Sequence, residues 1–365
     1  MSTRSAPAGP PGAAQAAPGA ARPPASDLAD RPLVIAWEVT RACGYRCHHC
    51  RADAQPRPLP GELDAAQGRA LVDALSPFAG SVLVLTGGDP LLRKDLEALV
   101  ERAAGVGLAV ALTPSATPRV RTERLRSLRD AGVRQVALSL DGAGPPSHDG
   151  LRGLRGSFAR TLRILEAARE EGLRVQVNTT VTRRNQDELE DVAHLAEGVG
   201  AEMWSVFFLV PVGRAQSREM ISAEDHERAF HRLADLAGRV PFRLKVTAAP
   251  AYRRVLVERG VPRAALPPAA NDGRGFMFVS HDGEVCPSGF LPISAGNVRT
   301  SSPVDLYRGS RLFRELRDPA LLRGRCGRCP FRDTCGGSRA RAFAVSGDHL
   351  GEDPACVFEP EGTTC

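Results

Sequence analysis

The chain has 365 residues, of which 42% are hydrophobic and 25% are charged, and its formal net charge is +6. These values are ordinary for a soluble globular protein, and the length allows one large domain and one smaller one. No apolar run approaches the roughly 20 residues that a membrane-spanning helix needs, so we expect no membrane association. Lys94 and Lys245 are the only lysines, and no basic stripe alternates with aromatic residues, so we expect no nucleic-acid partner.

The first 30 residues are rich in proline, alanine and glycine and contain no apolar stretch of signal-peptide type. Such a composition buries too little apolar surface to fold by itself, so we predict a disordered tail over residues 1–30 and a cytoplasmic location. The chain has nine cysteines. Without an export signal, they favour metal binding over disulfide bonds.

Strand-like and helix-like segments then alternate over residues 31–240. The expected strands are residues 33–39, 81–86, 108–113, 134–140, 174–180 and 203–209. The expected helices are residues 63–75, 95–104, 123–130, 157–171, 189–197 and 222–239. Six βα units at regular spacing predict a parallel sheet with right-handed crossovers. The pattern alone does not distinguish an open sheet from a partial barrel.

The pattern changes near residue 241, where glycine, proline and cysteine become frequent. We therefore predict a second, small cysteine-rich α+β domain over residues 241–365. Residues 276–291 contain two short apolar runs around Asp282 and Gly283, which predicts a hairpin that packs this domain onto the first.

Cys43, Cys47 and Cys50 directly follow the first expected strand. Three thiolates can hold three irons of a 4Fe–4S cluster and leave the fourth iron open to another ligand. A zinc site completed by His48 or His49 is the alternative. However, α/β folds place their active sites in the loops after the carboxyl ends of strands. This position favours a reactive iron–sulfur cluster over zinc.

The segment resembles the signature of the radical S-adenosylmethionine (radical SAM) enzymes. The resemblance implies that the amino and carboxylate groups of SAM complete the cluster. It also implies that the reduced cluster cleaves SAM to a 5′-deoxyadenosyl radical. The expected fold is a partial (β/α)6 parallel barrel whose open side accommodates the substrate. The expected redox partner is a low-potential electron donor such as ferredoxin or flavodoxin.

Residues that follow the later strands are candidates for binding SAM. Gly87, Gly88 and Asp89 match the family's Gly-Gly-Glu segment, which binds the amino group of SAM, although the acid here is one methylene shorter. Two glycines also let the backbone approach a ligand closely. Ser139 and Asn178 end the fourth and fifth strands and are candidates for contacts to the ribose or carboxylate. Residues 113–115 and 141–142 either contact a ligand or only form turns.

A second group of cysteines consists of Cys326, Cys329, Cys335 and Cys356. Four thiolates can ligate either a tetrahedral zinc ion or a 4Fe–4S cluster, and the spacing does not choose between them. The array resembles the SPASM/Twitch extensions of radical SAM enzymes, which hold auxiliary clusters. The resemblance therefore implies a second 4Fe–4S cluster, with a role in electron transfer or structural support.

A further auxiliary cluster is not expected. Cys286 is present, but Ser301 and Arg339 occupy positions where the family's full array would have cysteines. Cys286 is best interpreted as a buried, inert thiol, with a free thiol, a substrate contact or a spare ligand as alternatives. Cys365, at the end of the chain, is expected to have no role.

Residues 85–90 and 287–292 most resemble haem-pathway radical SAM enzymes, which decarboxylate or remove propionates from iron porphyrins, and related cofactor and peptide maturases. We therefore predict an enzyme whose radical abstracts hydrogen from a small-molecule or peptide substrate, such as a haem-pathway or other cofactor precursor. A maturase of a ribosomally made peptide is the first alternative. A non-catalytic iron–sulfur or zinc protein is the second, and a redox sensor is a weaker third.

Overall fold

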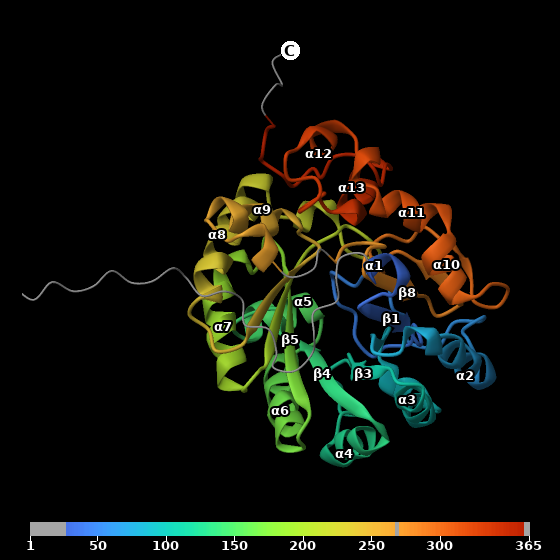
Figure 1. Ribbon diagram of the computed structural model, residues 1–365. Coiled ribbons are helices and arrows are strands. Elements are labelled where there is room, and N and C mark those ends of the chain that lie inside the picture. The colour runs from blue at the N-terminus through green and yellow to red at the C-terminus, as the bar shows by residue number, and fades with distance from the viewer. Residues whose placement is uncertain (1–26, 267–269, 361–365) are drawn as a thin grey trace, which may run out of the picture.

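The computed structural model describes residues 27–266 and 270–360, and a curved ten-stranded sheet forms its centre (Figure 1). The strand order is β10-β9-β8-β1-β2-β3-β4-β5-β6-β7. The strands are β1 (Val34–Glu38), β2 (Val82–Thr86), β3 (Ala109–Leu112), β4 (Val133–Ser139), β5 (Arg174–Val181), β6 (Met203–Phe208), β7 (Arg243–Thr247), β8 (Phe276–Val279), β9 (Glu284–Cys286) and β10 (Gly296–Asn297). Neighbours from β8 through β1 to β7 pair in parallel, whereas β9 and β10 are antiparallel.

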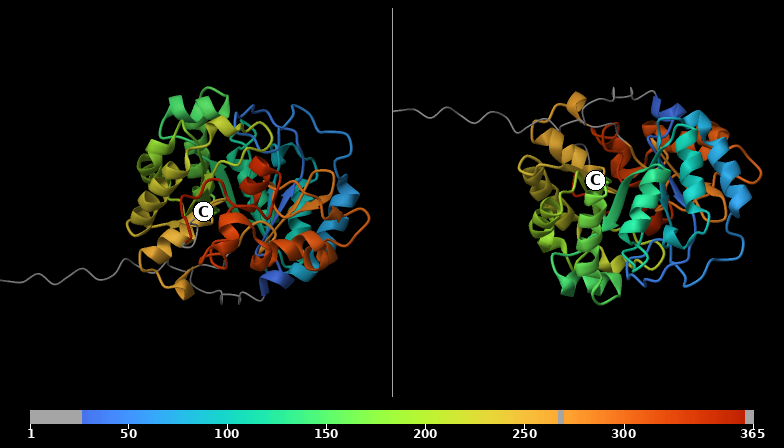
Figure 2. Two further views of the ribbon diagram at one scale, coloured as in Figure 1. Left: turned by 90° about the horizontal axis from the view of Figure 1, so that it is seen from above. Right: turned by 90° about the horizontal axis from the view of Figure 1, so that it is seen from below.

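Most helices surround the outside of this sheet, and the last two lie at one end of it (Figure 2). They are α1 (Asp27–Asp30), α2 (Ala65–Ala74), α3 (Leu96–Gly105), α4 (Thr122–Ala131), α5 (Pro145–Arg152), α6 (Ser157–Glu170), α7 (Leu189–Gly198), α8 (Ala223–Ala237), α9 (Ala251–Glu258), α10 (Pro303–Gly309), α11 (Arg311–Arg317), α12 (Gly324–Arg328) and α13 (Arg339–Ser346). Side chains cap several of them. The Ser222 hydroxyl accepts a hydrogen bond from the Asp225 N–H at 3.0 Å and so fixes the start of α8.

The two faces of the sheet differ in solvent exposure. Ile35 and Trp37 of β1 are fully buried in the core between the sheet and the helices. On the other face of β5, Gln176, Asn178 and Thr180 remain partly accessible, so buried and accessible side chains alternate along the strand. The same alternation is found in β2. The inner face of the sheet therefore lines a space that solvent reaches, which we call the lumen.

The last part of the chain, which contains α12 and α13, packs on the carboxyl end of the barrel. In α13, Arg341 donates to the main-chain carbonyl of Ala248, the residue after β7, at 2.8 Å. It also lies beside the carbonyls of Phe208, which ends β6, and of Leu209, which follows it. Ala340 shares an apolar cluster with Leu291 and with residues after β6. The red α12 and α13 of Figure 1 thus lie at the end of the barrel where the loops after the strands gather.

The predicted α/β fold with a parallel partial barrel is confirmed, and all six expected strands form within two residues of their expected limits. The parallel sheet is larger than expected, because β7 joins β6 and β8 joins β1. The hairpin expected at residues 276–291 forms as β8 and β9. Since β7 and β8 continue the same sheet, the domain boundary near residue 241 stays a prediction.

The remaining expectations concern the N-terminal tail and membrane-spanning helices. Residues 1–26 of the predicted tail lie outside the described residues, and its last four residues form α1. Leu28 of α1 is buried, and its carbonyl accepts a hydrogen bond from the Tyr307 hydroxyl. In the described part of the chain no helix is both long and apolar enough to cross a membrane; the cytoplasmic location stays a prediction.

Candidate functional site

The loop after β1 contains Cys43, Cys47 and Cys50, which we call the first cysteine group. The loop after β2 holds it in place: the Gly88 N–H donates to the Thr40 carbonyl at 2.8 Å, and the Asp89 N–H donates to the Ala42 carbonyl at 2.7 Å. A Cβ on Gly88 would lie 2.2 Å from the Ala42 oxygen. Gly87 has φ +140°, and a Cβ there would lie 2.2 Å from the Thr40 oxygen. The two glycines are thus needed for this close approach of two main chains.

The side chains of the first cysteine group lie together with Tyr45 and Ala54. Main-chain N–H groups point at two of the sulfurs, from Tyr45 to Cys43 at 3.3 Å and from Ala54 to Cys50 at 3.4 Å. Burial raises the pKa of Cys47 to about 11, so this thiol needs a bound metal to become the thiolate that ligates iron. Sulfurs that receive N–H donors in a buried site fit an iron–sulfur cluster.

A single metal ion fits less well. Among residues 27–266 and 270–360, no group of three or more His, Cys, Asp and Glu side chains is arranged to hold one ion. Zinc requires its sulfurs at about 2.3 Å from one centre. A 4Fe–4S cluster does not require the cysteine sulfurs to converge on one metal ion, because each cysteine ligates a different iron and the sulfurs stay farther apart.

Ser115, in the loop after β3, links the first cysteine group to the loop after β2. Its hydroxyl lies 3.2 Å from the Cys43 sulfur and 3.2 Å from the carbonyl of Gly88. The side chain of Asp89 is buried. Its carboxylate accepts hydrogen bonds from the Leu91 N–H at 3.2 Å and the Thr117 hydroxyl at 3.1 Å. Its two oxygens are therefore both engaged inside the protein.

Asp141 is fully buried on another side of the first cysteine group. Its carboxylate lies 3.4 Å from Nε2 of His49 and 3.3 Å from Nη1 of Arg152, and it accepts from the Thr180 N–H at 2.8 Å. Burial alone raises the pKa of Asp141, but His49 and Arg152 outweigh burial and hold it well below the usual value. The contact with Asp141 fixes the ring of His49, which stands between Cys47 and Cys50 in the sequence. Its Nδ1 is buried with no hydrogen-bond partner in the described part of the chain.

Ser139 and Asn178 lie side by side on the inner face, since β4 and β5 pair them in register. Both are partly accessible. The Asn178 side-chain oxygen accepts a hydrogen bond from Gln176 Nε2 at 2.6 Å, and its amide nitrogen has no hydrogen-bond partner among the described residues. The geometry thus brings these two predicted residues together at the carboxyl ends of their strands.

Glu38, the last residue of β1, joins the barrel to the β8–β9 turn. It is fully buried and lies 2.8 Å from Arg51, 3.0 Å from Arg41 and 3.0 Å from Nδ1 of His281. Burial alone raises the pKa of Glu38, but Arg51, His281 and Arg41 lower it to about 2. Because Arg51 directly follows Cys50, this ionised carboxylate also fixes the far end of the cysteine loop.

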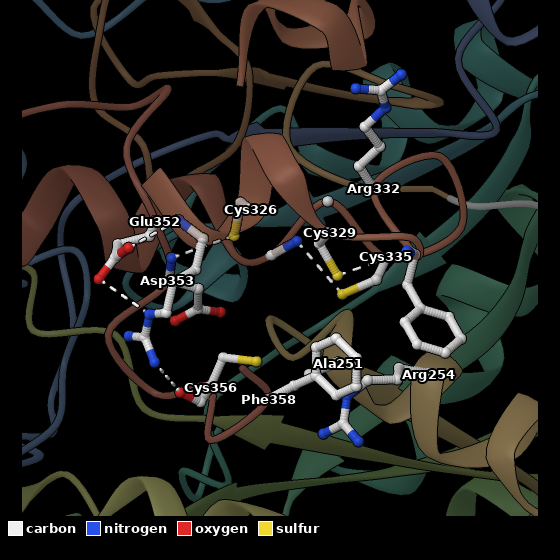
Figure 3. A pocket seen from close by; sticks show the side chains of 14 residues that line it. Ala251, Arg254, Cys326, Cys329, Arg332, Cys335, Glu352, Asp353, Cys356 and Phe358 are labelled. Atoms are coloured by element: carbon white, nitrogen blue, oxygen red, sulfur yellow. Dashed lines mark hydrogen bonds and ion pairs between the residues drawn. The ribbon is translucent and has the colours of Figure 1, made fainter. Parts of the chain in front are cut away.

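The second cysteine group lies around a hollow of about 430 Å³, which includes space open to solvent (Figure 3). It consists of Cys326, Cys329, Cys335 and Cys356. Arg254 and Phe358 close one side of the hollow, with the guanidinium carbon 5.3 Å from the ring centre. The structure therefore brings all four predicted cysteines together, although they come from segments up to 30 residues apart.

Hydrogen-bond donors also point at the sulfurs of the second cysteine group. The N–H groups of Phe331, Gly337 and Asp353 lie 3.4, 3.4 and 3.5 Å from the sulfurs of Cys329, Cys335 and Cys326. Burial raises the pKa of Cys356 to about 11. Like the first, this site suits thiolates that a metal centre stabilises.

Arg339 is buried beside the second cysteine group. Nη1 donates to the carbonyls of His349 and Gly351 at 3.1 and 2.6 Å, and Nη2 lies 3.6 Å from the Cys326 sulfur. A buried positive charge therefore stands where the family's full array would have a further cysteine. Cys286 lies elsewhere, on the inner face of β9, where burial raises its pKa to about 12.

Comparison with known proteins decides the family. The profile of the radical SAM superfamily matches residues 37–196. An AdoMet-dependent heme synthase of Oleidesulfovibrio alaskensis is 38% identical over 340 residues, which cover 90% of this chain and 87% of the relative. The chain belongs to the radical SAM superfamily. This membership makes it an enzyme and implies a 4Fe–4S cluster and SAM as cofactors.

Other radical SAM enzymes resemble it along most of their length. The mycofactocin maturase MftC of Mycobacterium ulcerans is 30% identical, over 90% of this chain and 88% of the relative. The solved structure of native anSMEcpe with bound AdoMet has a TM-score of 0.70 at 17% identity, and the match covers 89% of this chain and 94% of that one. At this identity the structural likeness shows the fold alone.

Several residues of the site have no clear signal in the sequence. Glu38, His281 and Arg152 gain their positions only through tertiary contacts over long sequence separations. Ser115 and Asp141 do follow strands, which places them near the mouth of the barrel, but the sequence leaves a turn as an equal interpretation. The register between strands was the missing information.

Proposed function

We propose that this radical SAM enzyme acts on a precursor of the haem pathway, using a 4Fe–4S cluster bound by Cys43, Cys47 and Cys50. The observation that most supports this is the 38% identity with an AdoMet-dependent heme synthase along 90% of the chain. Pre-heme d1 synthase of Dinoroseobacter shibae, 29% identical over 90% of this chain, supports the same substrate class.

The residues around the first cysteine group have separate tasks in this proposal. The three cysteines hold the cluster, which supplies, when bound, the electron that cleaves SAM to a 5′-deoxyadenosyl radical. Gly87, Gly88 and Asp89 contribute to SAM binding by shaping the loop beside the cysteines, because their main chain packs against the cysteine loop and the Asp89 carboxylate is engaged within the protein.

Ser139 and Asn178 offer a hydroxyl and an amide to SAM from the inner face. Asp141 keeps His49 in a fixed orientation with Nδ1 available to a ligand. The lumen then receives the substrate carbon from which hydrogen is removed.

The second cysteine group, in the same proposal, holds an auxiliary 4Fe–4S cluster. Three main-chain N–H donors and the buried Arg339 beside its sulfurs support this assignment. A bound cluster with four protein ligands has no open position, so its task is to transfer electrons or to stabilise the C-terminal part. A ferredoxin or flavodoxin is the proposed electron donor.

The test uses anaerobically reconstituted enzyme with dithionite, SAM and an iron porphyrin that bears propionates. Mass spectrometry should show a porphyrin product whose formation depends on SAM and is lost in the Cys43→Ala variant. A maturase of a ribosomal peptide is the second candidate, favoured by the similarity to MftC. If a precursor peptide encoded beside the gene is modified and the porphyrin is unchanged, the haem-pathway proposal is wrong.

A further inference from the structure

Two cations of β7 face the lumen. β6 and β7 pair Trp204 with Leu244 and Ser205 with Lys245. Trp204 is fully buried in the core on the outer face, so Lys245 and, two residues earlier, Arg243 share the inner face. The hydroxyl of Ser205 lies 3.0 Å from that of Thr247, two residues after Lys245, which supports this placement.

These two side chains have no carboxylate partner in the described part of the chain. Neither forms an ion pair there, and Arg243 lies 3.5 Å from the Met203 sulfur. The charged neighbours that influence them are cations: Arg243 for Lys245, and Arg174 of β5 for Arg243. By contrast, Arg51 and Arg152, beside the first cysteine group, are each paired with a buried acid, so the charges on β7 are less compensated than those near the cysteines.

The charge state of Lys245 follows from its surroundings. The side chain is exposed to solvent, although many protein atoms surround it. Burial, and then the charge of Arg243, lower the pKa of Lys245. Because water still reaches the amine, the ammonium form persists at neutral pH. An anion that entered the lumen would therefore be attracted by the positive charges and would relieve their repulsion.

Another wall of the lumen is apolar. Ala36, Phe278 and Cys286, from β1, β8 and β9, form one buried cluster on the inner face, with Val84 and Phe276 packed against it. The strands β7 and β9 stand toward opposite ends of the strand order. The lumen thus presents cations along one margin and apolar surface along the other.

We propose that Lys245 and Arg243 form a carboxylate-binding subsite for the substrate, which is a large apolar molecule with carboxylates at its edge. This inference rests on the proposed function, since a porphyrin with propionate side chains has this chemistry. β7 ends at Thr247, two residues after Lys245 and four after Arg243. Because a strand rises about 3.3 Å per residue, both cations lie below the carboxyl end of β7. The first cysteine group lies at that same end of the barrel. When Lys245 and Arg243 bind one carboxylate, another edge of the substrate faces the first cysteine group.

The experiment measures porphyrin binding by the holoenzyme in the presence of SAM, from changes in the Soret band. Two probes are compared: an iron porphyrin with free propionates and the same porphyrin with the propionates esterified. Lys245→Met should bind the free acid about tenfold to 100-fold more weakly than the wild type, the loss typical of one charged hydrogen bond. Lys245→Arg should retain most of the affinity.

Two controls separate a lost contact from a damaged protein. Lys94→Met removes the only other lysine, which is exposed before α3, and should leave the affinity unchanged. The esterified probe should bind the wild type and Lys245→Met equally, because it offers no carboxylate. Iron content and melting temperature should be the same in all variants.

The possible results distinguish this inference from the proposed function. Wild-type affinity of Lys245→Met for the free acid would overturn the subsite and leave the haem-pathway proposal standing. Failure of the wild type to bind either porphyrin, with a precursor peptide stimulating SAM cleavage instead, would overturn both.

Discussion

Replacement of Gly88 by alanine tests how the two loops at the mouth of the barrel support each other. The new Cβ would lie 2.2 Å from the Ala42 oxygen, 2.6 Å from the Ala42 carbon and 2.7 Å from the Arg41 oxygen. All three atoms belong to the main chain, so no side chain can rotate away, and the cysteine loop must retreat by about 1 Å to reach normal contact.

The cost follows from the contacts that this retreat disturbs. Overpacking costs about 1–3 kcal/mol, and the hydrogen bonds of Gly88 and Asp89 to this loop contribute about 1 kcal/mol each. A total of about 4 kcal/mol should lower the melting temperature by roughly 5 °C. The first cysteine group should also lose its cluster, so iron should fall from about eight to about four per chain.

The assay is iron and sulfide analysis after anaerobic reconstitution, together with thermal unfolding. Gly44→Ala is the matched control: Gly44 lies within the cysteine loop itself, but a Cβ there meets nothing within 4 Å. Its iron content and melting temperature should equal those of the wild type. A Gly88→Ala protein with full iron and unchanged melting temperature would refute the view that the glycines serve this close packing.

Three further predictions concern buried charges and thiols. Glu38→Gln should destabilise the protein at pH 7 by about 3–5 kcal/mol, because Arg51 loses a buried partner. Since the folded pKa of Glu38 is lowered from 4.5 to about 2, the wild-type advantage in urea unfolding should persist above pH 4.5 and shrink as the pH falls toward 2; a constant difference down to pH 2 would contradict this. Cys286→Ser should leave the iron content unchanged, and Cys286 should resist alkylation at pH 8 because its pKa is about 12; loss of iron would make it a ligand. Arg339→Gln should lower the reduction potential of the proposed C-terminal cluster by roughly tens of millivolts in an EPR-monitored titration, because the positive charge beside Cys326 favours the reduced state; an unchanged potential would argue against that placement.

The repeating units of the barrel could be predicted from the sequence because their buried strands and amphipathic helices have strong periodicity. Residues 82–86 alternate in burial, and α8 begins at the Ser222 cap that the sequence indicates. By contrast, β7 has only five residues and its inner face is polar, so its alternation is too short to stand out in the sequence. Helix α5 was missed because it begins with two prolines and contains a glycine.

The site was predictable only as far as each residue belongs to a motif. The spacing of the cysteines and the glycine pair indicate the two groups, and their places after strands indicate the mouth of the barrel. The partners of Glu38 and Asp141 depend instead on contacts between strands and loops over 243 and 92 residues, for His281 and His49 respectively. Similarly, the parallel pairing of β8 with β1 adds the apolar wall of the lumen and cannot be inferred from local pattern.

The most direct test of the central claim is the production of 5′-deoxyadenosine. Wild-type enzyme and a variant with Cys43, Cys47 and Cys50 all replaced by alanine are reduced anaerobically with dithionite in the presence of SAM, and the products are separated by chromatography. We predict 5′-deoxyadenosine from the wild type and none from the triple variant, which should keep about four irons in the second cysteine group. Equal amounts from both proteins, or none from wild type with full iron and an iron porphyrin bearing propionates present, would contradict the account.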